Sequence, residues 1–291
     1  MGEILQYLLT GLSLGGIYAL IALGFYLMWS ATKAANFTHG DVYMFGALLT
    51  VVMVEQGILL PIAAAVAIVV AAALGALIER ILVRPFNQEP NAIGWMLTTI
   101  AVGIMLESGA TVTYGPLGRP LHSPLAESPI RFAGAGIYLQ EMLLPIAAVV
   151  AIFALEAFQR RTMLGRAMRA VAFNRTAAGL MGINPNRITI FAFALAAAVG
   201  AFAGILIAPV VQAAPSMGAL VGLKAFGVAI VAGIANARGV VIVGLGYGVI
   251  EKFIEAYISS GARNAVGFTL MILALLAFPQ GIFGEREVEK V

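Results

Sequence analysis

The sequence predicts an all-α fold, a polytopic bundle of transmembrane helices. Of its 291 residues, 61% are hydrophobic and 11% are charged, whereas a soluble domain usually carries about 25% charged residues. Several runs without acidic or basic residues reach or approach the roughly 20 residues that a spanning helix needs. They are 4–32, 56–78, 90–106, 188–223 and 264–284. We therefore expect a single membrane domain, residues 1–291, with no soluble domain.

Nine apolar segments are candidate spans. They lie near residues 4–29, 41–55, 57–78, 92–107, 140–158, 188–208, 219–235, 240–257 and 264–280. The segments 41–55, 219–235 and 240–257 are short, interrupted by glycine or charged, so one could be re-entrant and eight spans remain an alternative. We expect the first segment to be retained, because it is too long for a secretory signal and follows an acid, Glu3. The loop Ser108–Leu139 is expected to form a short structured cap.

Arginine and lysine set the expected orientation, because loops rich in these residues stay cytoplasmic. Six arginines and no acid lie between Gln159 and Arg187, a stretch that we call the basic island. Arg80 with Arg84, and Lys33 with His39, indicate two further inside turns. This scheme puts the N-terminus outside and the tail "EREVEKV" inside.

Motifs for catalysis are missing from the sequence. No P-loop occurs, so the chain does not cradle ATP phosphates, and "GLGYG" at 244–248 is not a dinucleotide fingerprint. We expect its glycines, with "GLSLG" (11–15) and "GAFAG" (200–204), to let helices pack closely. With no cysteine and two histidines, His39 and His122, on opposite sides, we expect no metal site and no enzyme.

Four charged residues, Lys224, Glu251, Lys252 and Glu255, fall in or beside expected spans. They could form a proton relay or an ion site, because charge inside a membrane is expensive and usually faces protein or water. We favour the alternative in which Lys224 snorkels at a membrane face and the other three cluster at a helix end.

The stretch "NFTHGD" (36–41) concentrates polarity between two apolar helices and holds the only aspartate, Asp41. Asn36 or Thr38 could cap a helix while Gly40 relaxes a turn. Alternatively Asn36, Thr38, His39 and Asp41 form a polar gate at the inner end of a pathway. The residues alone do not separate these alternatives.

Several motifs together resemble the LivH-type permease of bacterial branched-chain amino-acid ABC importers. They are "LGGIYALIALG" (14–24), "NFTHGDVYMFGA" (36–47), "GRAMRAVAFNRTAAGLMGINPNRI" (165–188), "GLKAFGVAIVAGI" (222–234) and "FPQGIFGEREVEKV" (278–291). The resemblance covers nearly the whole chain. Thr38 stands where that family usually has alanine, and "AGIANARGV" (232–240) replaces "GGIGSxxGA". Similar relatives carry urea, amides or other neutral amino acids.

The resemblance implies an ATP-driven importer with several subunits in a bacterial inner membrane, so the outside N-terminus would be periplasmic. Two related permease subunits form the pore, two cytoplasmic ATPase subunits bind ATP and Mg²⁺, and a periplasmic binding protein delivers the substrate. We expect no cofactor in this chain and no contact with nucleic acid. A stand-alone secondary carrier and a subunit of a proton-pumping complex are the alternatives, but no helix-breaking repeat or string of buried charges supports them.

The resemblance also implies a cytoplasmic coupling helix in the basic island, at 172–183. The ordered A-x₄-A-x₄-G pattern before Pro185 favours close contact with an ATPase, whereas arginines alone would also suit a topology signal that holds anionic lipid. The coupling candidates are Arg169, Ala172, Phe173, Asn174, Arg175, Ala177, Ala178, Gly179, Leu180, Met181 and Gly182.

A zwitterionic solute is costly to desolvate, and helix ends or exposed backbone lining a cavity can offset that cost. Further candidates for the pathway are Ser13, Gly15, Gly16, Thr98 and Thr99. A packed helix interface would use the same residue types.

Overall fold

The computed structural model describes residues 2–87, 93–132 and 134–284. The expected inside tail, 285–291, and the first residue of the expected span 92–107 lie outside the described residues.

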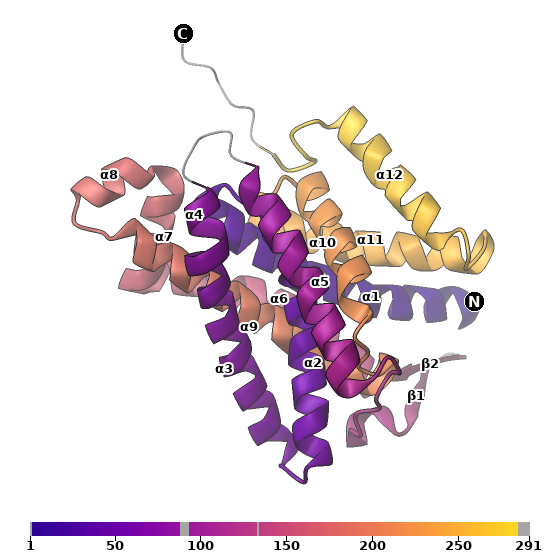
Figure 1. Ribbon diagram of the computed structural model, residues 1–291. Helices are drawn as coiled ribbons and strands as arrows, with labels where there is room; N and C mark the ends of the chain where they lie inside the picture. The colour runs from indigo at the N-terminus through magenta and orange to yellow at the C-terminus, as the bar shows by residue number, and fades with distance from the viewer. Residues whose placement is uncertain (1, 88–92, 133, 285–291) are drawn as a thin grey trace.

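Helices make up most of the described chain (Figure 1). The long ones are α1 (Gly2–Thr32), α2 (His39–Glu55), α3 (Leu60–Ile78), α5 (Gly94–Tyr114), α6 (Leu139–Arg161), α9 (Pro185–Val211), α10 (Met217–Ala232), α11 (Ala237–Tyr257) and α12 (Arg263–Ala277). The shorter ones are the π-helical η1 (Glu79–Val83), α4 (Arg84–Phe86), the 3₁₀ turn η2 (Pro124–Ala126), α7 (Met163–Phe173) and α8 (Arg175–Leu180). The strands β1 (Pro129–Phe132) and β2 (Ala135–Tyr138) form an antiparallel hairpin, in which Pro129 lies opposite Tyr138.

A long helix lies at each of the nine expected positions. Five are long and apolar enough to cross a membrane by length and composition, namely α1, α3 with its continuation to Phe86, α5, α6 and α9. Of the others, α2, α10 and α12 have 17, 16 and 15 residues, and α11 has 21 but carries several charged side chains. Helices α2 and α10 are thus short, as we expected for 41–55 and 219–235, and α12 is short in addition. Helix α11, the third segment in question, is of full length but charged.

The fourth expected span was too short in our prediction. Helix α5 continues past Glu107 to Tyr114 and ends at Gly115, whose φ is 87°. Thr111 and Thr113 do not interrupt the helix, because their hydroxyls donate to the carbonyls of Glu107 and Gly109 at 2.9 and 2.7 Å. The expected cap therefore begins after α5, and it contains η2 and the hairpin.

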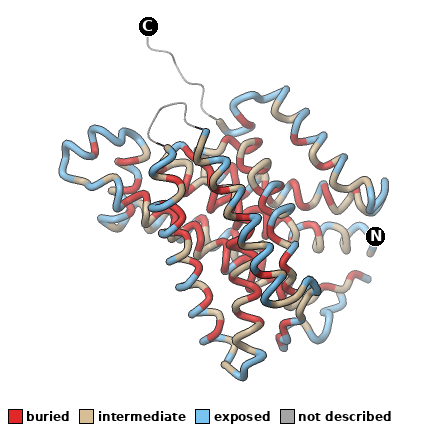
Figure 2. The backbone as a smooth tube through the Cα atoms, in the orientation of Figure 1, coloured by how far each residue is buried: buried red, intermediate tan, exposed pale blue. Residues whose placement is uncertain are grey.

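Helix α1 forms the centre of the protein, with α6, α9, α10 and α11 packed around it. Its residues are buried from the middle to the C-terminal end, as the red tube in Figure 2 shows. Glycine makes the closest of these contacts possible. A Cβ atom on Gly15 would lie 2.6 Å from the carbonyl oxygen of Leu245 in α11, and one on Gly248 would meet the backbone of Gly15. The expected close packing through glycine is confirmed here.

The segment "GAFAG" (200–204) has the same role against α2. A Cβ on Gly204 would collide with the carbonyl oxygen of Tyr43, and one on Gly200 would lie 3.0 Å from the His39 ring. These glycines let α2 and α9 pack closely. His39 lies in this contact and is 1% exposed.

Large apolar side chains cover the outer faces of α3, α5, α6 and α12. Val69, Leu97, Phe153 and Leu276 are 62–74% exposed. An apolar surface of this extent suits hydrocarbon rather than water. The helices therefore bury their small residues against one another and turn their large apolar ones outward.

Hydrogen bonds between distant segments define two ends of the bundle. At one end Arg84 donates to the carbonyl oxygen of Asn186 at 3.0 Å, and Asn87 donates to that of Thr32 at 3.1 Å. This end collects the basic island, the turn at Arg84 and the end of α1 beside Lys33, and we call it the basic end. His39, which we expected in the same inside turn as Lys33, is instead buried against the middle of α1 and α9. At the other end Gln6 bonds the backbone of Gly136, and Arg119 pairs with Glu55 at 2.6 Å.

Candidate functional site

The basic island folds into two short helices, α7 and α8, that project from the bundle at the basic end (Figure 1). Thr162 caps the first turn of α7 by accepting from the amide of Gly165 at 3.0 Å. Helix α7 buries Met168 and Val171 and leaves charged side chains exposed, as an amphipathic helix does. The basic island therefore contains two regular helices and is not an irregular loop.

The expectation of one continuous helix over 172–183 is wrong. Asn174 breaks it with an extended conformation (φ −153°), and its side chain caps α8 by accepting from the amide of Ala177 at 2.9 Å. An asparagine side chain satisfies the free amides of a new helix better than it fits a helix interior. Gly182, with φ 85°, lies after the end of α8, so the A-x₄-A-x₄-G pattern is not one helix face.

The coupling candidates nevertheless form one exposed surface around this break. Phe173, Leu180 and Met181 are 94%, 86% and 82% exposed. Asn174, Arg175, Ala177, Gly179 and Gly182 are exposed too, Ala172 is half-buried, and Ala178 alone among these residues packs inward. A Cβ on Gly179 would have only the ring of Pro185 within 4 Å, at 3.9 Å. We call Phe173, Gly179, Leu180 and Met181 the α8 surface.

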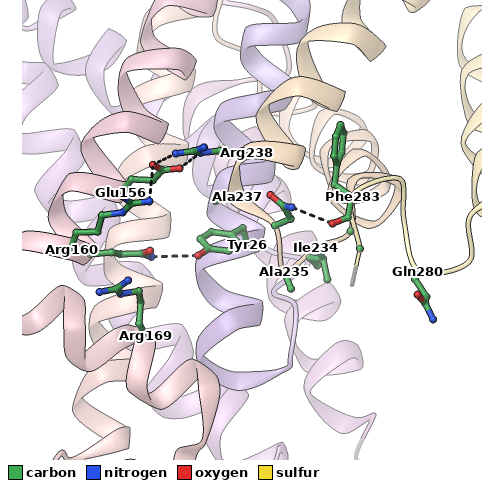
Figure 3. Close-up of a pocket in the computed structure, with 14 residues that line it drawn as sticks. Tyr26, Glu156, Arg160, Arg169, Ile234, Ala235, Ala237, Arg238, Gln280 and Phe283 are labelled. Atoms are coloured by element: carbon green, nitrogen blue, oxygen red, sulfur yellow. Dashed lines mark hydrogen bonds and ion pairs between the residues drawn. The ribbon is translucent and has the colours of Figure 1, made fainter. Parts of the chain in front are cut away.

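Arg169 belongs to a neighbouring cavity between the basic island and the bundle. This cavity of about 560 Å³ is bounded by α1, α6, α7, the start of α11 and the chain after α12. Figure 3 shows the side chains of Arg160, Arg169 and Arg238 around one opening. Arg238 donates to both carboxylate oxygens of Glu156 through its Nε and Nη2 atoms, with the Nη2 bond at 2.6 Å.

Sequence reasoning missed this cavity. Glu156 and Arg160 show the i, i+4 spacing of a helical ion pair, which was a usable signal, and they lie 3.9 Å apart. Arg238 and Tyr26 gave no such signal, because the cavity exists only once α1, α6 and α11 meet.

The gate candidates divide into two groups in space. Thr38, Thr99 and Asn36 form one polar cluster, in which the Thr38 hydroxyl donates to the Thr99 carbonyl at 2.6 Å and Asn36 accepts from the Thr38 amide at 3.1 Å. Asp41 lies beside this cluster, where a Cβ on Gly103 of α5 would collide with its Oδ2. Among the described residues, no hydrogen-bond partner meets Asp41 Oδ1, although the side chain is 4% exposed.

The remaining candidates lie in helix contacts. Ser13 donates to the Glu141 carbonyl at 2.7 Å, Gly15 faces α11 and Gly16 faces Leu144 of α6. Thr98 donates to the Gly94 carbonyl of its own helix at 3.0 Å. His39 contacts the Ile21 carbonyl at 3.2 Å and stacks edge-on against Phe25. The structure thus brings Asn36, Thr38, Asp41 and Thr99 together and leaves Ser13, Gly15 and Gly16 in other interfaces.

The expectation that Lys224 snorkels is wrong. Lys224 is 1% exposed and pairs with Glu251, which is 0% exposed. Glu251 also accepts from the Tyr18 hydroxyl at 2.8 Å and lies 3.1 Å from Arg263. Glu251 is therefore not in a surface cluster, because the glycine-rich contacts of α1 and α11 draw it into the interior. Lys252 and Glu255 do form the expected pair near a helix end, at 3.2 Å.

The arrangement of apolar helices, buried ion pair and projecting basic element can be compared with known proteins. A family model described as "Branched-chain amino acid transport system / permease component" matches residues 7–276. The chain belongs to this permease family. It is a multi-pass membrane protein, a permease subunit of an ABC importer, in agreement with the resemblance seen in its motifs.

Two relatives of this branched-chain amino acid permease family cover nearly all of the chain. The high-affinity branched-chain amino acid transport system permease protein LivH of Escherichia coli K12 is 35% identical over 303 residues, 99% of this chain and 97% of that protein. The corresponding permease protein BraD of Pseudomonas aeruginosa is 34% identical over 305 residues, 99% of this chain and 98% of that protein.

A solved structure resembles this permease in fold. It is PsaBC from Streptococcus pneumoniae in complex with Fab, with a TM-score of 0.50 at 14% identity, covering 94% of this chain and 91% of that chain. At this identity the likeness concerns the arrangement of helices alone.

Proposed function

We propose that this permease forms half of the translocation pathway of an ATP-driven importer for branched-chain or other neutral amino acids. The names of the relatives at 34–35% identity support this class of solute. A second, related permease subunit would form the other half of the pathway. A periplasmic binding protein would deliver the solute, and two cytoplasmic ATPases would hold the ATP and Mg²⁺.

The α8 surface carries the proposal for coupling. Three large apolar side chains, Phe173, Leu180 and Met181, are more than four-fifths exposed on a small basic element at the basic end. A cluster of this kind on a water-facing element marks a contact with another protein. Arg175 lies beside it and bonds Asn186 at 2.8 Å, so its charge is held near the contact for an acidic partner.

Orientation follows from the same element. The basic end is proposed to be cytoplasmic, which puts the N-terminus and the hairpin outside, because basic segments stay inside. The ATPases then meet the α8 surface from the cytosol. Closure of the ATPases would push α7 and α8, and this motion would reach the bundle where α7 packs on α6 and α9.

The cluster of Asn36, Thr38, Asp41 and Thr99 is the proposed polar part of the pathway. It lies where α2 begins and α5 covers it, and most of α5 is exposed on its outer side. A small displacement of α5 would open the Asp41 carboxylate and the Thr38 hydroxyl toward a passing solute. The permease needs to hold that solute only weakly, because differential binding in the two states drives transport.

Reconstitution in liposomes tests the proposal. The permease with its partner permease, both ATPases and the binding protein should accumulate leucine only when ATP is supplied. The purified permease alone, supplied with ion gradients, should not. Concentrative uptake by the chain alone would make it a secondary carrier. ATP-driven uptake of urea or an amide in place of leucine would keep the architecture and change the solute.

A further inference from the structure

The cavity beside α7 is strongly basic. Of the described residues that line it, Arg160, Arg169 and Arg238 are cationic and Glu156 is the single acid. Glu156 is engaged by Arg238, while no carboxylate within 2–87, 93–132 or 134–284 pairs with Arg169. The guanidinium of Arg160 is 3.9 Å from Glu156 and its side chain is 68% exposed. Three arginines and one glutamate give the described lining a net charge of +2, which attracts an anionic group.

An apolar strip continues from this cavity along the bundle. On α6, Val149, Phe153, Glu156 and Arg160 recur at spacings of four, three and four, which puts them on one helix face. Val149 and Phe153 are 40% and 62% exposed. On the neighbouring α11, Ile242 follows one turn after Arg238 and is 56% exposed. On both helices, therefore, the basic side chains lie at the end next to the cavity, and exposed apolar side chains follow farther along the bundle.

We propose that this cavity binds the head group of an anionic phospholipid, with its acyl chains along Val149, Phe153 and Ile242. Guanidinium groups bind phosphate through paired N–H donors, and basic pockets between spanning helices at the cytoplasmic face are suited to such head groups. The cavity of about 560 Å³ has room for a glycerophosphate group, since one water occupies about 30 Å³. An acidic loop of a partner protein would match the charge but would leave the apolar strip unused.

Glu156 contributes by positioning. Its two oxygens accept from Nε and Nη2 of Arg238, which fixes this largely exposed guanidinium at the rim of the cavity. The cavity also lies where α6 ends at Arg161 and α11 begins at Ala237, where the chain enters and leaves the apolar bundle. A head group held there would join α6 and α7 to α11.

The test compares two arginine pairs in the purified full-length permease without ATPases. One variant carries Arg160→Gln and Arg169→Gln, which line the cavity. The control carries Arg161→Gln and Arg166→Gln, which are exposed on the same two helices outside it and remove the same charge. Binding of phosphatidylglycerol, cardiolipin and phosphatidylcholine is measured by native mass spectrometry and by lipid titration in detergent.

We expect the cavity variant to lose at least about tenfold in affinity for the anionic lipids, since each arginine near a surface contributes on the order of fivefold. The control should retain its affinity, and phosphatidylcholine should bind weakly to all forms. Soluble glycerol phosphate should not displace the lipid, because it lacks acyl chains.

Three results would overturn the proposal. Equal losses in the two variants would mean general attraction to a basic surface. Unchanged lipid affinity with lost ATPase association would assign the cavity to the partner protein. Displacement by glycerol phosphate would leave a site for free phosphate only. Because lipid binding is measured on the permease alone, failure of the coupling proposal would not affect it.

Discussion

Lys224 and Glu251 form an ion pair whose two side chains are 1% and 0% exposed. The same carboxylate accepts from Tyr18 and lies 3.1 Å from Arg263, so it joins α10, α11, α1 and α12. Removing one member of a buried ion pair destabilises a protein, because the other member then remains as an uncompensated charge in an apolar interior.

Replacing one partner of this pair should therefore destabilise the bundle. We expect Lys224→Met to lower the free energy of unfolding by about 3 kcal/mol, since Glu251 then stays buried and, within the described residues, keeps Arg263 alone as a cationic partner. The double change Lys224→Met with Glu251→Gln should recover most of that loss. Thermal unfolding in detergent measures both. Lys252→Met, in a partly exposed pair, should change stability by less than about 1 kcal/mol. Equal effects of Lys224→Met and Lys252→Met would contradict the role of burial.

Two glycines on α11 test the packing against α1. Gly248→Ala should destabilise by about 2 kcal/mol, because its Cβ would meet the backbone of Gly15 and the helices must separate. Gly246 lies two residues away with nothing within 4 Å of a Cβ. There Gly246→Ala should be neutral or stabilising by about 0.5–1 kcal/mol, as alanine favours the helix. Unfolding curves for both variants provide the comparison, and a loss at Gly246 as large as that at Gly248 would argue against this interface.

The absence of cysteine makes the orientation directly testable. A single Arg169→Cys in the basic island should react with a membrane-impermeant maleimide only after the cells are permeabilised. Ser128→Cys, exposed beside the hairpin, should react at once. The reverse labelling pattern would invert the proposed topology.

Tryptophan at two glycines separates docking from packing. Gly179→Trp adds an indole to the α8 surface, where a Cβ has almost no neighbours, so the permease should fold normally. Uptake should nevertheless fall at least tenfold, with loss of ATPase association or of substrate-stimulated hydrolysis. Gly204→Trp would collide with the backbone of Tyr43, and it should reduce the amount of folded permease. Normal uptake and normal coupling in Gly179→Trp would mean that 172–183 is not the coupling segment.

Asp41 tests the proposed pathway. Asp41→Asn keeps the shape of the side chain and removes a buried charge whose Oδ1 has no partner among the described residues, so folding should be unimpaired. Leucine uptake by the reconstituted importer should fall at least tenfold. The control Thr50→Val removes a buried hydroxyl of the same helix whose one hydrogen-bond partner among the described residues is the Gly46 carbonyl, and it should leave uptake unchanged. Normal transport by Asp41→Asn would exclude the carboxylate from the pathway.

Much of the fold could be predicted because its causes are local. Hydrocarbon requires apolar helices of sufficient length, and the nine segments appear as nine helices. Helix ends were less accurate where no residue stops a helix. The hydroxyls of the threonines after Glu107 donate to backbone carbonyls of α5 itself. These polar residues therefore do not end the helix, which continues to Gly115. Asn174 could have been recognised as a cap, since asparagine before a helical run is a start signal.

By itself the sequence determined a helical membrane protein, its close glycine contacts and its basic island, since composition, spacing and charge act within a few turns of chain. Only the tertiary structure decided the surroundings of individual polar groups. Lys224 and Glu251 are 27 residues apart, and the cavity joins Tyr26, Arg169 and Phe283 from distant parts of the chain. Whether a charged side chain reaches water or a partner depends on which helices meet around it, and packing settles that over the whole bundle.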